Sequence, residues 1–275
     1  MFEYAFMQRA FLAGIILGIA IPCVGVVVVL KRLSMMGDAL SHTSLAGVAA
    51  GLIGGIDPVL GATIACLGAA GAVEFIRRRF EGHAELAIAV VMSCGIGLAG
   101  VLSGFVPNAA SFSSFLFGSI VAVDTNQLIA VSIVGAAVLV LCVLMRKELF
   151  WVTLDERAAR LAGVRVKLVN AAFIVITALA VSVGARTVGA LIVSSMMVVP
   201  VACALQVAKS WRATVIVSCG IGLATTAAGL WLSYAFGLKP GGTIVLLGVA
   251  LLLAIIAGKR LVEKARGTRL ARVPR

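Results

Sequence analysis

Long apolar runs, each followed by a short basic patch, constrain this sequence more than any other feature. The chain has 275 residues, of which 62% are hydrophobic and only 12% are charged. Several runs approach the roughly 20 apolar residues that an α-helix needs to cross a bilayer. Because lipid offers the backbone no hydrogen-bond partners, these runs predict transmembrane α-helices. We therefore expect an all-α, polytopic integral membrane protein.

The apolar runs predict nine transmembrane helices, or eight if one weak segment is re-entrant. The expected helices cover about residues 9–30, 34–54, 59–76, 86–104, 128–145, 168–184, 188–208, 213–236 and 243–257. The polar and aromatic segment 105–127 predicts an outer loop with a short re-entrant or interfacial helix. Residues 1–258 then form a single transmembrane domain, and residues 259–275 form a basic cytoplasmic tail.

The net charge of +12 is explained by topology and does not require nucleic-acid binding. Of the 23 Lys and Arg residues, 20 fall in five short patches between or after the apolar runs, at 31–32, 77–79, 146–167, 209–212 and from 259 onward. Cytoplasmic loops of membrane proteins carry such an excess of positive residues. The pattern predicts that the N-terminus lies outside the cell membrane and the C-terminus lies in the cytoplasm.

Asp38 and His42 are ionisable residues inside the second expected span. Residues four apart lie on one face of a helix, and ionisable residues within a membrane usually mark a functional site. A carboxylate and an imidazole suit Zn²⁺, Mn²⁺ or Fe²⁺. The alternative is a structural Asp–His hydrogen bond that satisfies a buried polar pair, and spacing alone leaves both open. Counted from Arg32 at 1.5 Å per residue, His42 is expected about 15 Å into the membrane.

The longest inside segment predicts a short amphipathic helix with a body at residues 156–161. Thr153 or Asp155 can cap its N-terminus, and Gly163 suits its C-terminal end. Such a helix either lies on lipid headgroups or docks a cytoplasmic partner, and its periodicity does not separate these alternatives.

Several function classes lack their sequence motifs. The chain has no G-x-x-x-x-G-K-[ST] loop, so ATP hydrolysis is expected only in a separate subunit. The G-x-G-x-x-G match at residues 95–100 lies within a span, which favours close helix packing over dinucleotide binding. An intramembrane aspartyl protease would need a second Asp within a span, whereas Asp57, Asp124 and Asp155 fall in loops. A stand-alone ion-coupled carrier stays open as a different class of protein.

The chain resembles the ABC-3 family, the inner-membrane permeases of bacterial ABC transporters for zinc, manganese and iron(II). The matching segments are, in order, LKRLSMMGDALSHTSLAGVA, SFLFGSIVAVDTNQL, TLDERAARLAGV, VGALIVSSMMVVPVACAL and GLKPGGTIVLL. The resemblance implies an ABC importer permease fold and a homodimer that is not itself an enzyme. It also implies two copies of a cytoplasmic ATPase subunit and an extracytoplasmic metal-binding protein as partners.

The resemblance also implies roles for individual residues. Asp38 and His42 match the family's metal ligands in the translocation path. The segment 153–164 resembles the family's coupling helix, which implies that the ATPase is docked by Asp155, Glu156, Arg157, Ala158, Arg160 and Gly163. No permanently bound cofactor is expected, because the metal ion is the cargo.

The identity of the transported metal is less constrained than the family. The residues 44–47 and the segment LFGSIVAVDT look like zinc-type members, and many manganese-type members carry Pro where Ala46 stands. We therefore favour zinc, with manganese, iron(II) or a siderophore- or cobalamin-type cargo as alternatives. A role in metal release near the inner exit stays open for Glu74, Glu81, Glu85 and His83.

Overall fold

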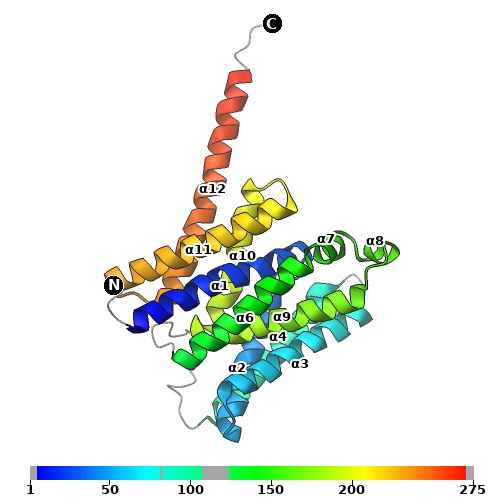
Figure 1. The fold of residues 1–275 in the computed structure, drawn as a ribbon, viewed down its shortest axis with the longest axis vertical. Coiled ribbons are helices and arrows are strands. Elements are labelled where there is room, and N and C mark those ends of the chain that lie inside the picture. The colour runs from blue at the N-terminus through cyan, green and yellow to red at the C-terminus, as the bar shows by residue number, and fades with distance from the viewer. Residues whose placement is uncertain (1–4, 81–82, 107–123, 271–275) are drawn as a thin grey trace.

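The computed structural model describes residues 5–80, 83–106 and 124–270, and these residues are almost entirely α-helical. The described ranges contain nine helices of at least 18 residues and two short helices, α7 and α8 (Figure 1). In chain order they are α1 (Ala5–Leu30), α2 (Met36–Gly54), α3 (Pro58–Arg79), α4 (Ala84–Ser103), α6 (Thr125–Leu144), α7 (Arg146–Leu154), α8 (Glu156–Leu161), α9 (Val166–Thr187), α10 (Ala190–Val207), α11 (Trp211–Phe236) and α12 (Pro240–Leu270).

Each of the nine predicted spans coincides with one long helix. Seven of the described helices are long and apolar enough to cross a membrane, namely α1, α3, α4, α6, α9, α11 and α12. The two others are α10, an 18-residue helix without charged residues, and α2, which carries Asp38 and His42. The predicted re-entrant helix falls mostly at 107–123, outside the described residues.

The predicted tail, which starts at residue 259, begins within the last helix. Helix α12 continues through Leu270, so residues 259–270 extend the last helix instead of leaving it. Figure 1 shows this part of α12 projecting beyond the bundle. The first half of the predicted tail is therefore helical.

The helices differ in how much of their surface the bundle covers. Most of α1 and α9 is buried, whereas α6 and α12 are largely exposed. The exposed side chains of α6 and α12 are large and apolar, and they include Ile133, Val140, Leu246 and Leu253. An exposed apolar surface of this kind is suited to lipid.

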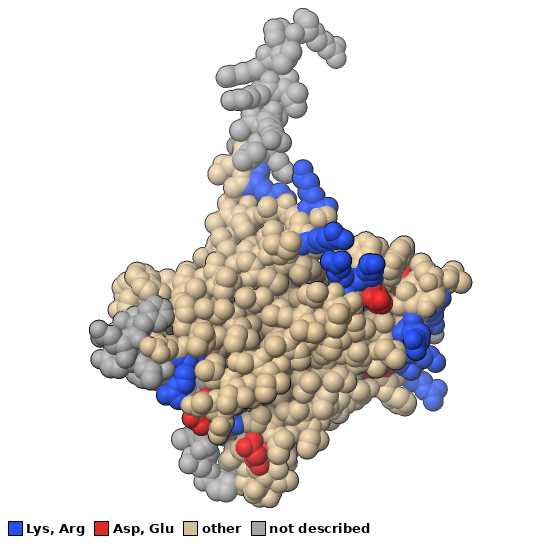
Figure 2. Space-filling model, in the orientation of Figure 1, with Lys and Arg blue, Asp and Glu red and all other residues tan. Residues whose placement is uncertain are grey.

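Charged residues gather at the two ends of the bundle. Figure 2 shows most Lys and Arg residues at the end that carries α7 and α8, with a broad uncharged band below them. At the opposite end, ion pairs at 3.9 Å join Arg9 to Asp124 and Arg186 to Asp57. The uncharged band has the character expected of a membrane-spanning surface.

The second helix is held tightly by its neighbours α3 and α4. Gly47 and Gly61 face each other so closely that a Cβ atom on either one would overlap the other's carbonyl oxygen. On another side of α2, a Cβ atom at Gly95 of α4 would lie 2.7 Å from the Thr43 hydroxyl oxygen. Gly95 belongs to the G-x-G-x-x-G match, so the packing interpretation is confirmed at that glycine. Gly97 and Gly100 have open space around them.

Candidate functional site

Asp38 and His42 occupy the first two turns of α2. The helix begins at Met36, so His42 lies about 9 Å along it at 1.5 Å per residue. A turn separates α1 from α2, so the rise to His42 along the helix is counted from Met36, four residues after Arg32. Both side chains are half-buried. The N-terminal turn of a helix stabilises negative charge, which suits the carboxylate of Asp38.

The two side chains point away from three close contacts of α2. Helix α2 meets α10 at Gly37, where a Cβ atom would lie 3.3 Å from the Ser194 hydroxyl oxygen. It meets α4 at Thr43 and α3 at Gly47. With about 100° between successive residues, Asp38 and His42 lie at least about 100° from each of these three positions. They therefore share a face of α2 away from these three contacts, and the same face is buried further along the helix at Leu45 and Ala49.

Neither side chain has a polar partner within the described part of the chain. No hydrogen bond or ion pair joins Asp38 or His42 to another described residue, and the structural Asp–His hydrogen bond is not made. Among the same residues, no group of three or more His, Cys, Asp or Glu side chains is arranged to hold a metal ion. The chain thus supplies a carboxylate and an imidazole that can accept a cation but cannot complete its coordination alone.

The predicted short helix is present as α8. Asp155, not Thr153, caps it, and one oxygen of its carboxylate accepts hydrogen bonds from the amides of Arg157 at 2.7 Å and Ala158 at 3.3 Å. After the helix, Gly163 has a φ of 82°, a conformation that favours glycine. These local features confirm the predicted start and end of the helix.

Five of the six predicted docking residues lie on the surface of this segment. Asp155, Arg157, Ala158, Arg160 and Gly163 are exposed. Leu161 is 91% exposed and adds apolar area to the same surface. Glu156 differs, because only 26% of its side chain is exposed and it points into the protein.

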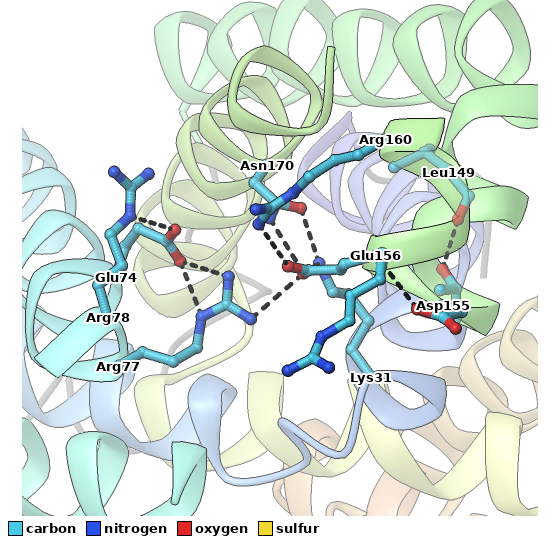
Figure 3. A network of polar contacts seen from close by, with 11 residues as sticks. Lys31, Glu74, Arg77, Arg78, Leu149, Asp155, Glu156, Arg160 and Asn170 are labelled. Atoms are coloured by element: carbon cyan, nitrogen blue, oxygen red, sulfur yellow. Dashed lines mark hydrogen bonds and ion pairs between the residues drawn. The ribbon is translucent and has the colours of Figure 1, made fainter. Parts of the chain in front are cut away.

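Glu156 lies at the centre of a network of polar contacts between α3, α8, α9 and the turn that follows α1 (Figure 3). Its Oε1 atom pairs with Lys31 Nζ at 3.0 Å and with Arg77 Nη1 at 3.3 Å, and it accepts a hydrogen bond from Asn170 Nδ2 at 3.1 Å. Lys31 Nζ also donates to Asn170 Oδ1 at 2.7 Å. We call Lys31, Glu74, Arg77, Glu156 and Asn170 the Glu156 cluster. Sequence reasoning missed Asn170, which lies at an expected lipid-spanning position but is buried at 5% exposure.

Comparison with known proteins identifies the family. Residues 3–259 match the ABC 3 transport family. The chain belongs to the ABC-3 family. The Treponema pallidum protein named "Probable metal transport system membrane protein" is 35% identical over 94% of this chain and 97% of its own length. The Streptococcus parasanguinis "Manganese import system permease protein ScaB" is 30% identical over 89% of this chain and 87% of its own.

A solved structure supports the same assignment for the fold of this ABC-3 permease. The structure titled "PsaBC from Streptococcus pneumoniae in complex with Fab" superposes with a TM-score of 0.82 at 30% identity. The match covers 92% of this chain and 91% of the other chain. This chain is therefore the membrane permease subunit of a metal ABC importer, and the ATPase is a separate subunit.

The charge state of the Glu156 cluster follows from its geometry. Burial alone would raise the pKa of the Glu156 carboxyl, but Lys31, Arg77 and Asn170 outweigh burial and lower it to about 2. Burial also lowers the pKa of Lys31 from its ordinary value, and Glu156 opposes that change. Glu156 is therefore ionised throughout the physiological pH range, when it can pair with Lys31.

The Glu156 carboxylate is expected to stabilise the ABC-3 permease above pH 4.5 and to lose that effect as the pH falls toward 2. Its pKa falls from 4.5 to about 2 on folding, so the unfolded chain takes up a proton first on acidification. Thermal unfolding of wild type and Glu156→Gln in detergent, from neutral pH to about pH 3, measures the difference. A difference independent of pH would contradict this prediction. Glu85→Gln, at an exposed site, is the matched control.

The acidic residues near the cluster have different surroundings. Glu74 pairs with Arg77 at 2.9 Å and with Arg78 at 3.0 Å, so both of its oxygens are engaged by arginines. These ion pairs favour a role for Glu74 in balancing the charge of the basic patch. Glu85 and His83 are exposed beside an open cavity of about 1140 Å³, and Glu81 lies outside the described residues.

Proposed function

We propose that this permease passes a divalent transition-metal ion into the cell, with Asp38 and His42 as ligands along its path. The observation that carries the proposal is the half-buried carboxylate–imidazole pair on one face of α2, without a polar partner among the described residues. Two such groups without partners are suited to accept a cation that loses its water. A site with only these two ligands should bind the metal ion weakly, which suits a site that must release its cargo.

A second copy of this chain would complete the coordination. The pair supplies two ligands, while transition metals in proteins take four or more. In a symmetric homodimer the same residues of the second subunit add two more, if the pair lies near the axis. The lack of a polar partner for either side chain among the described residues supports this arrangement, because their ligand atoms are not engaged within one subunit.

The choice of metal rests on two indications that differ. The residues 44–47 look like zinc-type members of the family, whereas a relative at 30% identity is named as a manganese import permease. Carboxylate and imidazole ligands accept zinc, manganese and iron(II). We retain zinc as the favoured cargo and treat manganese as the alternative with a specific observation behind it.

Helix α8 is proposed to dock the ATPase on the cytoplasmic side. Its exposed polar residues and the exposed Leu154 and Leu161 form a mixed surface suited to a protein partner. The Lys and Arg residues around α7 and α8 support a cytoplasmic location for this end of the bundle (Figure 2). The N-terminus would then lie outside, where a metal-binding protein delivers the ion.

Reconstitution with the partner ATPase tests the proposal. Proteoliposomes that hold the permease and the ATPase, supplied with the metal-loaded binding protein, should take up zinc or manganese only with ATP. Competition between the two metals then ranks them. ATP-independent uptake by the permease alone would favour a stand-alone carrier. Uptake of a bulky metal chelate without free metal would favour a siderophore- or cobalamin-type permease.

A further inference from the structure

The Glu156 cluster joins the proposed docking helix α8 to the chain segment that leads into α2, the helix that carries Asp38 and His42. Glu156 belongs to α8, and Lys31 directly follows α1. Their side chains meet at 3.0 Å, and the side chain of Lys31 is only 8% exposed. Arg77 of α3 and Asn170 of α9 bind the same oxygen of Glu156. A displacement of Glu156 would therefore first move Lys31, at the start of the α1–α2 turn.

The α1–α2 turn is short and internally bonded. Its amides at Lys31, Arg32 and Leu33 donate to carbonyls in the last turn of α1, and the amide of Met36 donates to Leu33 O at 2.8 Å. Leu33 and Met36 are buried at 7% and 1% exposure. A segment with these bonds and anchors moves as a unit with the start of α2, which carries Asp38 two residues after Met36.

Arg32 shows that this turn is held in an unfavourable backbone conformation. Its φ of 59° is the only positive value at a non-glycine residue in the described part of the chain. Such conformations persist where the surroundings enforce them, and they occur often in segments that switch. The neighbouring contact of Lys31 with Glu156 and Asn170 is one such restraint.

The docking helix itself has few apolar anchors in the bundle. Ala159 is its buried residue, while Leu161 is exposed. An open cavity of about 1140 Å³ adjoins it and is lined by Lys31, Glu74, Arg77, Glu156 and Asn170 among others. Because this region is not filled by packed side chains, ionic contacts across it are well placed to carry movement from α8 to α2.

We propose that the Glu156–Lys31 ion pair is the mechanical link by which the ATPase, bound at α8, repositions Asp38 and His42. The inference rests on the proposed function, and it adds a positioning role for two residues that do not touch the metal. Glu156 thus acts inward on the turn, while its exposed neighbours on α8 face the ATPase. Loss of the pair should separate ATP hydrolysis from transport.

The test measures ATP hydrolysed per ion transported in proteoliposomes that hold the whole transporter. Glu156→Gln and Lys31→Gln are expected to bind the ATPase normally and to hydrolyse ATP, but to need about 10-fold more ATP per ion, within the usual range of coupling factors. Lys31→Arg keeps the charge and should restore the wild-type ratio. Lys167→Gln is the matched control, because Lys167 is exposed beside the same cavity and lies outside the proposed docking segment 153–164.

The outcomes separate this inference from the proposed function. If wild type transports no metal, the proposed function fails first. If wild type transports metal and both Gln variants keep its ATP-to-ion ratio, the link between Glu156 and Lys31 is overturned. Hydrogen exchange in the wild-type complex covers the case in which the variants do not fold. Nucleotide binding should change exchange at residues 31–38, and unchanged exchange there would also overturn the inference.

Discussion

Asn in place of Asp38 is expected to lower ATP-driven metal uptake at least about 100-fold in the reconstituted transporter. Loss of a residue that merely supports a metal ligand costs 10–100-fold, and loss of a ligand itself should cost more. Asn keeps the size and one oxygen of Asp but removes the negative charge that balances the cation. Gln in place of His42 should have a similar effect, because it removes the imidazole nitrogen.

The two substitutions should not add. If both residues bind one ion, the double variant has no site left to lose and should resemble either single variant. Asp57→Asn provides a matched control, since it makes the same chemical change at the N-cap of α3, where Asn can also cap. Uptake is measured with the abundance of each variant and its binding to the ATPase. Wild-type uptake by both single variants at normal abundance would remove Asp38 and His42 from the path.

Ala in place of Gly61 is expected to prevent correct packing of α2 on α3. The added methyl group would overlap the carbonyl oxygen of Gly47, which is backbone and cannot rotate away. Excess volume in a packed interior costs about 1–3 kcal/mol and sometimes more. We therefore expect a lower unfolding temperature and less protein in the membrane. Gly47→Ala should behave alike, because it affects the same contact from the other helix.

A second glycine of α3, Gly68, provides a control for this prediction. Gly68 has no atom within 4 Å of the position that a Cβ would take. Ala there should be neutral or stabilising by about 0.5–1 kcal/mol, because it favours the helix over the unfolded chain. Thermal unfolding of the two variants compares one substitution at two sites of one helix. Equal stability of Gly61→Ala and Gly68→Ala would show that the close approach of α2 and α3 is not required.

Much of the fold could be predicted from the sequence because the bilayer sets the length of each helix. The start of α3 follows from Asp57 and Pro58, since a carboxylate caps the helix and proline suits its first turn. The limits of α8 follow from Asp155 and Gly163 for equally local reasons. The pair of Asp38 and His42 was also visible, because ionisable residues are rare within apolar sequence.

The contacts between distant segments could not be predicted in the same way. Lys31 and Asn170 are 139 positions apart, and Arg77 is 79 positions from Glu156. The positive-inside pattern places basic residues at one end of the bundle but does not say which carboxylate each will meet. The contact of Gly47 with Gly61 was hidden for another reason, since the chain has 30 glycines and only the structure distinguishes those that touch.

The polar first half of α2 has a consequence for biogenesis. A nascent segment leaves the translocon for lipid when its apolar residues outweigh its polar ones, and an Asp opposes that step by up to about 2.5–3.5 kcal/mol at the helix centre and by less near a helix end. Helix α2 carries Asp38 in its first turn and is not among the seven helices that are long and apolar enough to cross a membrane. Its entry into the bilayer is therefore expected to depend on neighbours, with α2 and α3 inserting together as a helical hairpin. The helix that carries Asp38 and His42 thus needs the rest of the bundle to reach the membrane.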